Sequence, residues 1–90
     1  MIELTRFTAH DRKRLLAARP AMLADFEADR AGYLGARLVE LPGGEWLDIV
    51  EWRSAEDFRI SREKGPNRPG IAEFFAAIDG LVSDEQGELR

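Results

Sequence analysis

The sequence predicts an α+β fold in which helices cover one face of a four-stranded antiparallel sheet. Short runs rich in β-forming residues alternate with longer runs whose apolar residues recur at helical spacing. A Gly43-Gly44 pair lies between two of the strand-like runs, as in a β-hairpin. The predicted order is β, α, β, β, a broken α and β, which is the split βαβ or ferredoxin-like arrangement. We expect residues 1–90 to form one domain.

The first predicted strand covers residues 2–8 and is followed by a helix. Alternation along this strand places Ile2, Leu4 and Arg6 on one side, and Glu3, Thr5 and Phe7 on the other. Asp11 can cap the helix, whose apolar stripe comprises Leu15, Leu16, Met22, Leu23 and Phe26. Pro20 lies inside this stripe and removes one backbone hydrogen bond. We therefore expect a kink near residues 17–20, or two abutting helical segments.

The register of the hairpin follows from its turn. A two-residue Gly43-Gly44 turn predicts four facing pairs, namely Leu41 with Trp46, Val39 with Asp48, Arg37 with Val50, and Gly35 with Trp52. One face then carries Tyr33, Arg37, Trp46, Asp48 and Trp52, which we interpret as a dimer or barrel face. The opposite face carries Leu34, Ala36, Leu38, Leu47 and Ile49, and we expect helices to pack on it. Arg37 and Asp48 are diagonal neighbours and are expected to pair, contributing about 0.2–1 kcal/mol.

The second half of the chain predicts a capped helix, a break and a final strand. Ser54, with Asp57 three residues later, resembles a capping box. The segment 65–70, GPNRPG, cannot be helical throughout, so the chain turns there. A second amphipathic segment follows and ends near Gly80, with apolar positions at Ile71, Phe74, Phe75, Ile78 and Leu81. Residues 81–87 form a weak last strand.

The composition excludes several classes of function. A net charge of −4 argues against a nucleic-acid partner, because phosphate recognition requires a basic surface. No apolar run approaches the roughly 20 residues of a membrane span, and the N-terminal segment lacks a signal-peptide core. We therefore expect no membrane contact and a cytoplasmic location. The absence of cysteine excludes a disulfide, a thiol nucleophile and a thiolate metal site.

Three segments carry a resemblance to a known family by their order and spacing. They are the opening strand LTRF, the sequence GYL at residues 32–34, and the strand-to-helix junction EWRSAED at residues 51–57. Nearly the whole chain resembles the antibiotic biosynthesis monooxygenase family of the dimeric α+β barrel superfamily. The resemblance implies two ferredoxin-like subunits whose sheets close into a barrel. It also implies a ligand pocket between each sheet and its helices.

The chain departs from the haem-degrading branch of this superfamily. That branch uses an asparagine on the first strand, and a tryptophan and an iron-binding histidine on the second helix. Thr5 stands where the asparagine is expected, the only histidine is His10, and no tryptophan follows Trp52. We therefore predict neither a haem cofactor nor a metal site. The quinone-forming branch is cofactor-free, and it requires an apolar pocket with a few polar groups to stabilise an anion.

Eight residues define the predicted ligand pocket between sheet and helices. They are Thr5, Phe7, Met22, Phe26, Phe58, Arg62, Asn67 and Phe75. The break at residues 65–70 would hold the second helix away from the sheet and leave a cavity. Alternatively, the same aromatic residues fill a hydrophobic core. Thr5, Arg62 and Asn67 are the polar groups expected to reach into a cavity, and the spacing assigns no catalytic residue.

The resemblance implies a homodimer that binds a small apolar, aromatic or polyketide-like molecule and oxidises it with O2 without a cofactor. Two alternatives remain on the same fold. One is a dimer that binds without catalysis or is purely structural. The other is an isomerase or cyclase, which would require a positioned acid or base such as Asp48. Similarity of fold does not distinguish these functions.

Overall fold

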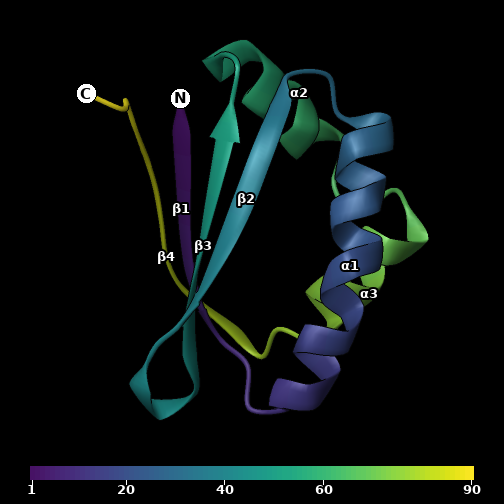
Figure 1. Ribbon diagram of the computed structural model, residues 1–90, viewed down its shortest axis with the longest axis vertical. Helices are drawn as coiled ribbons and strands as arrows, with labels where there is room; N and C mark the ends of the chain where they lie inside the picture. The colour runs from purple at the N-terminus through teal and green to yellow at the C-terminus, as the bar shows by residue number, and fades with distance from the viewer.

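The computed structural model describes residues 1–90 and confirms the predicted α+β fold (Figure 1). Its elements are β1 (Ile2–Thr8), α1 (Arg12–Asp29), β2 (Tyr33–Glu40), the 3-10 turn η1 (Pro42–Gly44), β3 (Glu45–Trp52), α2 (Ala55–Lys64), α3 (Pro69–Ala76) and β4 (Gly80–Gly87). The strand order is β2-β3-β1-β4, and all three pairings are antiparallel. The helices lie on one side of the sheet, as Figure 1 shows.

The central strand β1 has the predicted alternation. Thr5 faces Asp48 on β3 and Asp84 on β4, while Phe7 faces Trp46 and Leu81. Residues that face one another across antiparallel strands point to the same side of the sheet. Phe7 and Trp46 are both buried beneath the helices, so this row belongs to the helix-covered side.

The predicted hairpin register is wrong by one residue. Glu40, rather than Leu41, faces Trp46, and Arg37 faces Ile49 rather than Val50. The cause is Pro42, which joins the two glycines in a three-residue turn closed by the Leu41 amide donating to the Glu45 carbonyl at 2.8 Å. Each glycine takes a positive φ, 77° at Gly43 and 76° at Gly44. A shift of one residue moves every side chain on one strand to the opposite face relative to its partner strand.

The shifted register corrects the predicted dimer face. Trp46, Asp48 and Trp52 lie on the helix-covered side and are 3%, 8% and 2% exposed. Tyr33 faces Trp52 after an irregularity between residues 33 and 35, so it lies on that side too. Arg37 lies on the opposite, uncovered side with Ile49 and does not pair with Asp48. We call this uncovered side the open face; it is formed by Ile2, Leu4, Arg6, Arg37, Val39, Glu45, Leu47, Ile49 and Glu51.

Helix α1 is continuous across Pro20, and the predicted division into two segments is absent. Pro20 lies on the exposed side of α1. Solvent can therefore hydrate the Leu16 carbonyl, which a proline amide cannot satisfy. Asp11 caps the helix as predicted, because its carboxylate accepts from the Arg14 amide at 3.0 Å.

Helices α2 and α3 are separated at residues 65–68, within the predicted break at residues 65–70, and α3 already begins at Pro69. Ser54 caps α2 by accepting from the Asp57 amide at 3.1 Å, and its hydroxyl donates to the Asp57 carboxylate at 2.9 Å. The connection is held against the end of α1. There Arg30 donates to the Gly65 carbonyl at 2.6 Å and to Asn67 Oδ1 at 2.7 Å. The break is therefore an ordered turn between two helices.

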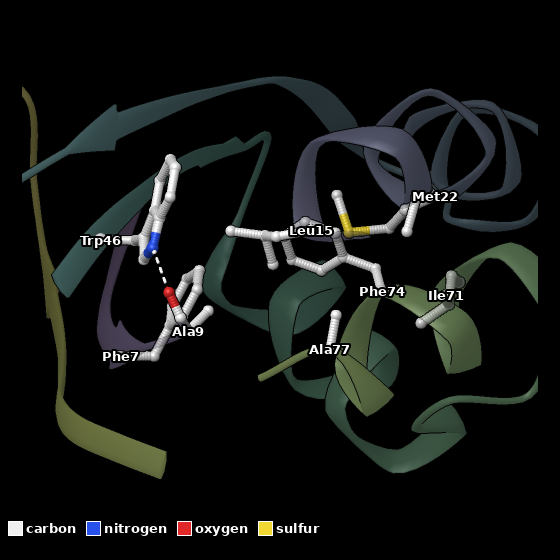
Figure 2. Close-up of a cluster of buried hydrophobic side chains, with 9 residues drawn as sticks. Phe7, Ala9, Leu15, Met22, Trp46, Ile71, Phe74 and Ala77 are labelled. Carbon is white, nitrogen blue, oxygen red and sulfur yellow. Dashed lines mark hydrogen bonds between the residues drawn. The ribbon is translucent and has the colours of Figure 1, made fainter. Parts of the chain in front are cut away.

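The hydrophobic core fills the space between α1, α3 and the sheet (Figure 2). Its buried members are Phe7, Ala9, Leu15, Ala18, Met22, Trp46, Ile71, Phe74 and Ala77. The rings of Phe7 and Phe74 meet edge to face at 6.2 Å. The Trp46 indole donates to the Ala9 carbonyl at 3.0 Å, drawn as a dashed line in Figure 2. Over this part of the sheet, the sequence-based alternative of a filled core is correct.

Candidate ligand-binding site

A hollow of about 300 Å³ remains beside the core, and we call it the α2–α3 hollow. Its lining comes from β1, α2, the end of α3, the connection between α3 and β4, and β4, and consists of Thr5, Arg62, Phe75, Ile78, Leu81 and Asp84. Its volume is at the lower end of the range for small-molecule pockets, about 300–1,000 Å³. Three apolar side chains and three polar ones suit a ligand with a hydrocarbon body and a few hydroxyl or carbonyl groups.

Pairing of β1 with β4 positions two of the polar side chains in the hollow, those of Thr5 and Asp84. Thr5 and Asp84 face each other across β1 and β4, so both side chains point toward the helices. An irregularity between Arg6 and Phe7 shifts the pairing, so that Leu81 faces Phe7. As a result, Leu81 lies at the border between the packed core and the hollow, and it is 65% exposed.

Arg62, in the last turn of α2, connects the helix to two strands. Its two terminal nitrogens bind the Asp84 carboxylate at 2.8 and 2.9 Å, and Nη2 also donates to Glu3 Oε2 at 2.8 Å. The guanidinium carbon lies 4.7 Å from the centre of the Phe58 ring. The hydrogen bonds with Asp84, followed by those with Glu3, raise the pKa of Arg62. Arg62 is therefore a permanent cation at the rim of the hollow.

Glu3 lies directly behind this rim. Its carboxylate accepts from the Trp52 indole at 3.0 Å and from the Thr5 hydroxyl at 3.4 Å, in addition to Arg62. Its side chain is only 13% exposed. Thr5 directs its proton toward Glu3, so its lone pairs can accept from a ligand that enters the hollow.

The structure brings together three of the eight predicted pocket residues, namely Thr5, Arg62 and Phe75. Phe7 and Met22 lie in the core. Asn67 lies at the α2–α3 connection, where its amide nitrogen donates to Asp29 at 3.1 Å.

Phe26 and Phe58, the other two, pack around Trp52. Their ring centres lie 6.3 and 6.2 Å from that of Trp52, and the Tyr33 ring lies 5.9 Å from it. Burial in this cluster raises the pKa of Tyr33. Trp52 is 2% exposed, so the centre of this cluster is packed, and none of its four rings lines either hollow.

Sequence reasoning missed Ile78, Leu81 and Asp84 as lining residues, and Glu3 behind them. Glu3 could have been predicted near the site, because alternation along β1 places its side chain on the same side of the sheet as Thr5 and Phe7. Asp84 is harder to predict from the sequence, since β4, the strand that carries it, shows little alternation of apolar and polar residues and pairs with β1 in an irregular register.

The candidate base Asp48 is closed off from the hollow. Arg19 binds both of its oxygens, at 2.6 and 2.9 Å, and both residues are 8% exposed. The pair faces Thr5 from the β3 side but does not line the hollow. No group of three or more His, Asp or Glu side chains is arranged to hold a metal ion.

A second hollow, of about 490 Å³, lies on the open face. Its lining includes Ile2, Leu34, Arg37, Ile49, Glu51 and Leu89. Leu34 and Leu89 are 60% and 73% exposed. Arg37 makes no ion pair and no side-chain hydrogen bond within the chain. This hollow is thus part of an uncovered apolar surface.

No helix combines the length and apolar character needed to cross a membrane.

No protein-family model matches the sequence, and no curated protein matches it. Solved structures do match its fold. SnoaB, a cofactor-independent oxygenase from Streptomyces nogalater, has a TM-score of 0.72 at 16% identity, over 99% of this chain and 93% of that one. Rv0793 from Mycobacterium tuberculosis has a TM-score of 0.66 at 19% identity, over 99% and 95%.

A third structure, described as an antibiotic biosynthesis monooxygenase, has a TM-score of 0.56 at 13% identity, over 99% of this chain and all of that one. These identities are too low to transfer an activity, and fold alone does not specify chemistry. The resemblance identified in the sequence therefore extends through the whole fold: this chain has the α+β architecture of the antibiotic biosynthesis monooxygenase proteins.

Proposed function

We propose that this protein binds a small hydroxylated aromatic molecule in the α2–α3 hollow and oxidises it with O2 without a cofactor. The observation that carries the proposal is the lining of the hollow. Phe75, Ile78 and Leu81 offer an apolar wall, while Arg62 and Asp84 offer a cation and a carboxylate within the same space. The fold likeness to a cofactor-independent oxygenase supports the choice of chemistry.

The proposed reaction uses the electron-rich ring of the substrate itself. Asp84 accepts a proton from a ring methylene group, and Arg62 stabilises the resulting enolate-like anion. The anion transfers its electrons to O2 and forms a C–O bond, and the proton from Asp84 converts the product to a hydroperoxide. Loss of water leaves a carbonyl, so the sum converts one methylene group and one O2 into one carbonyl group and one water. Asp84 regains its charge at the end of the cycle.

We also propose that the protein acts as a homodimer through its open face rather than through the Trp46 and Trp52 side. The open face exposes apolar side chains around a hollow, and a contiguous apolar surface on a small domain favours association. The unpaired guanidinium of Arg37 supplies a polar group that a second copy can satisfy.

Binding without catalysis is the second candidate function. It is favoured by the pairing of each polar group in the hollow, since Arg62 already contacts Glu3 and Asp84, and Thr5 contacts Glu3. Proton abstraction requires Asp84 to exchange its contact with Arg62 for one with the substrate. An isomerase that uses Asp48 is disfavoured, because Arg19 occupies both of its oxygens.

The experiment combines binding with oxygen consumption, using 1,8-dihydroxyanthrone as the probe. Binding is measured without oxygen, and turnover is then followed with an oxygen electrode. We expect Leu81→Trp to fill the hollow, abolishing both signals while leaving the melting temperature nearly unchanged. Val82→Trp is the matched control, because Val82 is 51% exposed and does not line the hollow.

The outcomes separate the two functions. Saturable binding that Leu81→Trp removes, with oxygen uptake above that of the free probe, supports the oxygenase. Saturable binding without added oxygen uptake supports the binding protein. A probe that does not bind, or that binds equally well to Leu81→Trp, would place the ligand site outside this hollow.

A further inference from the structure

The charges around the α2–α3 hollow do not balance. Arg62 is the only cation in its lining, and it contacts two carboxylates, Asp84 in the lining and Glu3 directly behind it. The next ion pair across the sheet, Arg19 with Asp48, is neutral as a unit. The hollow and its immediate rim therefore carry one net negative charge.

Most of the hydrogen-bonding capacity of Arg62, the only cation in the lining, is already taken by residues of the protein. Both terminal nitrogens of Arg62 bind Asp84, and one of them also binds Glu3. One face of the guanidinium covers the Phe58 ring. An incoming carboxylate would have to displace one of the resident carboxylates from Arg62, and the displaced group would remain in the same partly enclosed space.

We propose that the hollow selects uncharged ligands and discriminates against carboxylates, with Glu3 and Asp84 as the specificity-determining residues. The inference rests on the proposed function, since it concerns the ligand of the same hollow. A carboxylate ligand would raise the local charge from one negative to two. Like charges at short distance in a partly desolvated site repel far more strongly than in bulk water.

The proposed oxidation is consistent with this selection. A neutral substrate that gives its proton to Asp84 leaves the total charge unchanged, because one carboxylate is neutralised as the substrate anion forms. Arg62 is then released from Asp84 and can contact the new anion. A substrate that arrives already charged would leave an additional negative charge in the hollow at every stage.

The test compares two ligands of the same shape, 2-naphthamide and 2-naphthoate, by calorimetric titration at neutral pH and low salt. We expect the wild-type protein to bind the amide at least about tenfold more tightly. Glu3→Gln removes one negative charge and keeps one acceptor oxygen, which can serve Arg62 while the contact with the Trp52 indole is lost. The preference for the amide should then narrow to about threefold or less. Salt should weaken the preference as well.

Glu73→Gln is the control for a general change of charge. Glu73 lies on α3, is exposed and makes no ion pair, so its neutralisation should leave the wild-type preference intact. Asp84→Asn removes one negative charge from the lining itself. If Glu3→Gln does not fold, the same comparison of the two ligands on Asp84→Asn tests the proposal.

Equal or tighter binding of 2-naphthoate to the wild-type protein would overturn the selection while leaving the binding function in place. A preference that neither Glu3→Gln nor Asp84→Asn reduces would also overturn it. If neither naphthalene binds, the proposed function fails, and the selection fails with it.

Discussion

Arg19 and Asp48 form a bidentate ion pair between α1 and β3, with nitrogen–oxygen distances of 2.6 and 2.9 Å. Each residue is 8% exposed, and the Arg19 guanidinium lies 5.2 Å from the centre of the Phe74 ring. The pair therefore connects a helix, a strand and the aromatic core of α3. It also explains why Asp48 is not available to Arg37, whose side chain points to the other side of the sheet.

Removing one partner of this pair should strongly destabilise the fold. In Asp48→Ala the Arg19 charge remains buried without a counterion, and we expect a loss of about 3–5 kcal/mol in the free energy of unfolding. Urea denaturation followed by tryptophan fluorescence measures it. The double variant Arg19→Met/Asp48→Leu should recover most of the loss, because an apolar pair leaves no buried charge. A single variant within about 1 kcal/mol of wild type would contradict a buried pair.

Gly70 allows α1 and α3 to approach closely. A Cβ at this position would lie 2.5 Å from the Ala21 carbonyl oxygen and 2.7 Å from the Asp25 carboxylate, which accepts from the Gly70 amide. Gly70→Ala must push the two helices apart, and we expect a cost of about 1–3 kcal/mol in thermal or urea denaturation.

Gly87→Ala is the matched control for Gly70→Ala. A Cβ at Gly87 meets no atom within 4 Å. This change should stay within about 0.5 kcal/mol of wild type. Equal stabilities of the two alanine variants would mean that α1 and α3 can separate at little cost.

Asp29 should contribute to stability in a defined pH range. Hydrogen bonding from Asn67, reinforced by Lys64 and Arg30, lowers the pKa of Asp29 from 3.8 to about 2 in the folded protein. A lowered folded-state pKa means that the stabilisation is complete above the unfolded pKa of 3.8 and disappears as the pH falls through about 2.

The Asp29→Asn variant isolates this contribution. We expect it to be less stable than wild type at about pH 5, with the difference closing as the pH approaches about 2. Denaturation midpoints across this range provide the measurement. A difference that is unchanged down to the lowest pH would show that the effect of Asp29 is not one of charge.

Local signals predicted the order of elements, since each acts within a few residues. The Asp11 and Ser54 caps and the break after Lys64 all lie where the sequence indicates. The hairpin register was wrong because the prediction counted only the two glycines as the turn, whereas Pro42 joins them in a three-residue turn. That one-residue difference exchanged the covered and open faces of β2 relative to β3.

The candidate site was only partly predictable for a different reason. Thr5, Arg62 and Phe75 follow from strand alternation and from the helix break. The assignment of Phe26 and Phe58 to the pocket missed Trp52, a large side chain from β3 that packs between their elements. Side-chain packing of this kind depends on contacts distant in sequence, and periodicity within one element does not encode them.

The open face should form the dimer interface, and a charge placed there should separate the subunits. Ile49 lines the open-face hollow on the central part of β3 and faces Arg37 across β2 and β3. Ile49→Glu would therefore bury a carboxylate and the Arg37 guanidinium together in the interface, and the attraction between them does not recover the cost of removing both charges from water. Ile60→Glu is the matched control, because Ile60 is 39% exposed on α2, a helix on the other side of the sheet.

Light scattering should report about twice the chain mass of 10.2 kDa for the wild-type protein and for Ile60→Glu. Ile49→Glu should give the monomer mass while remaining folded, since Ile49 contributes no side chain to the core between sheet and helices. A dimer that survives Ile49→Glu would locate the interface elsewhere. A wild-type monomer whose stability does not change on dilution would show that the open face is stable in water without a second copy.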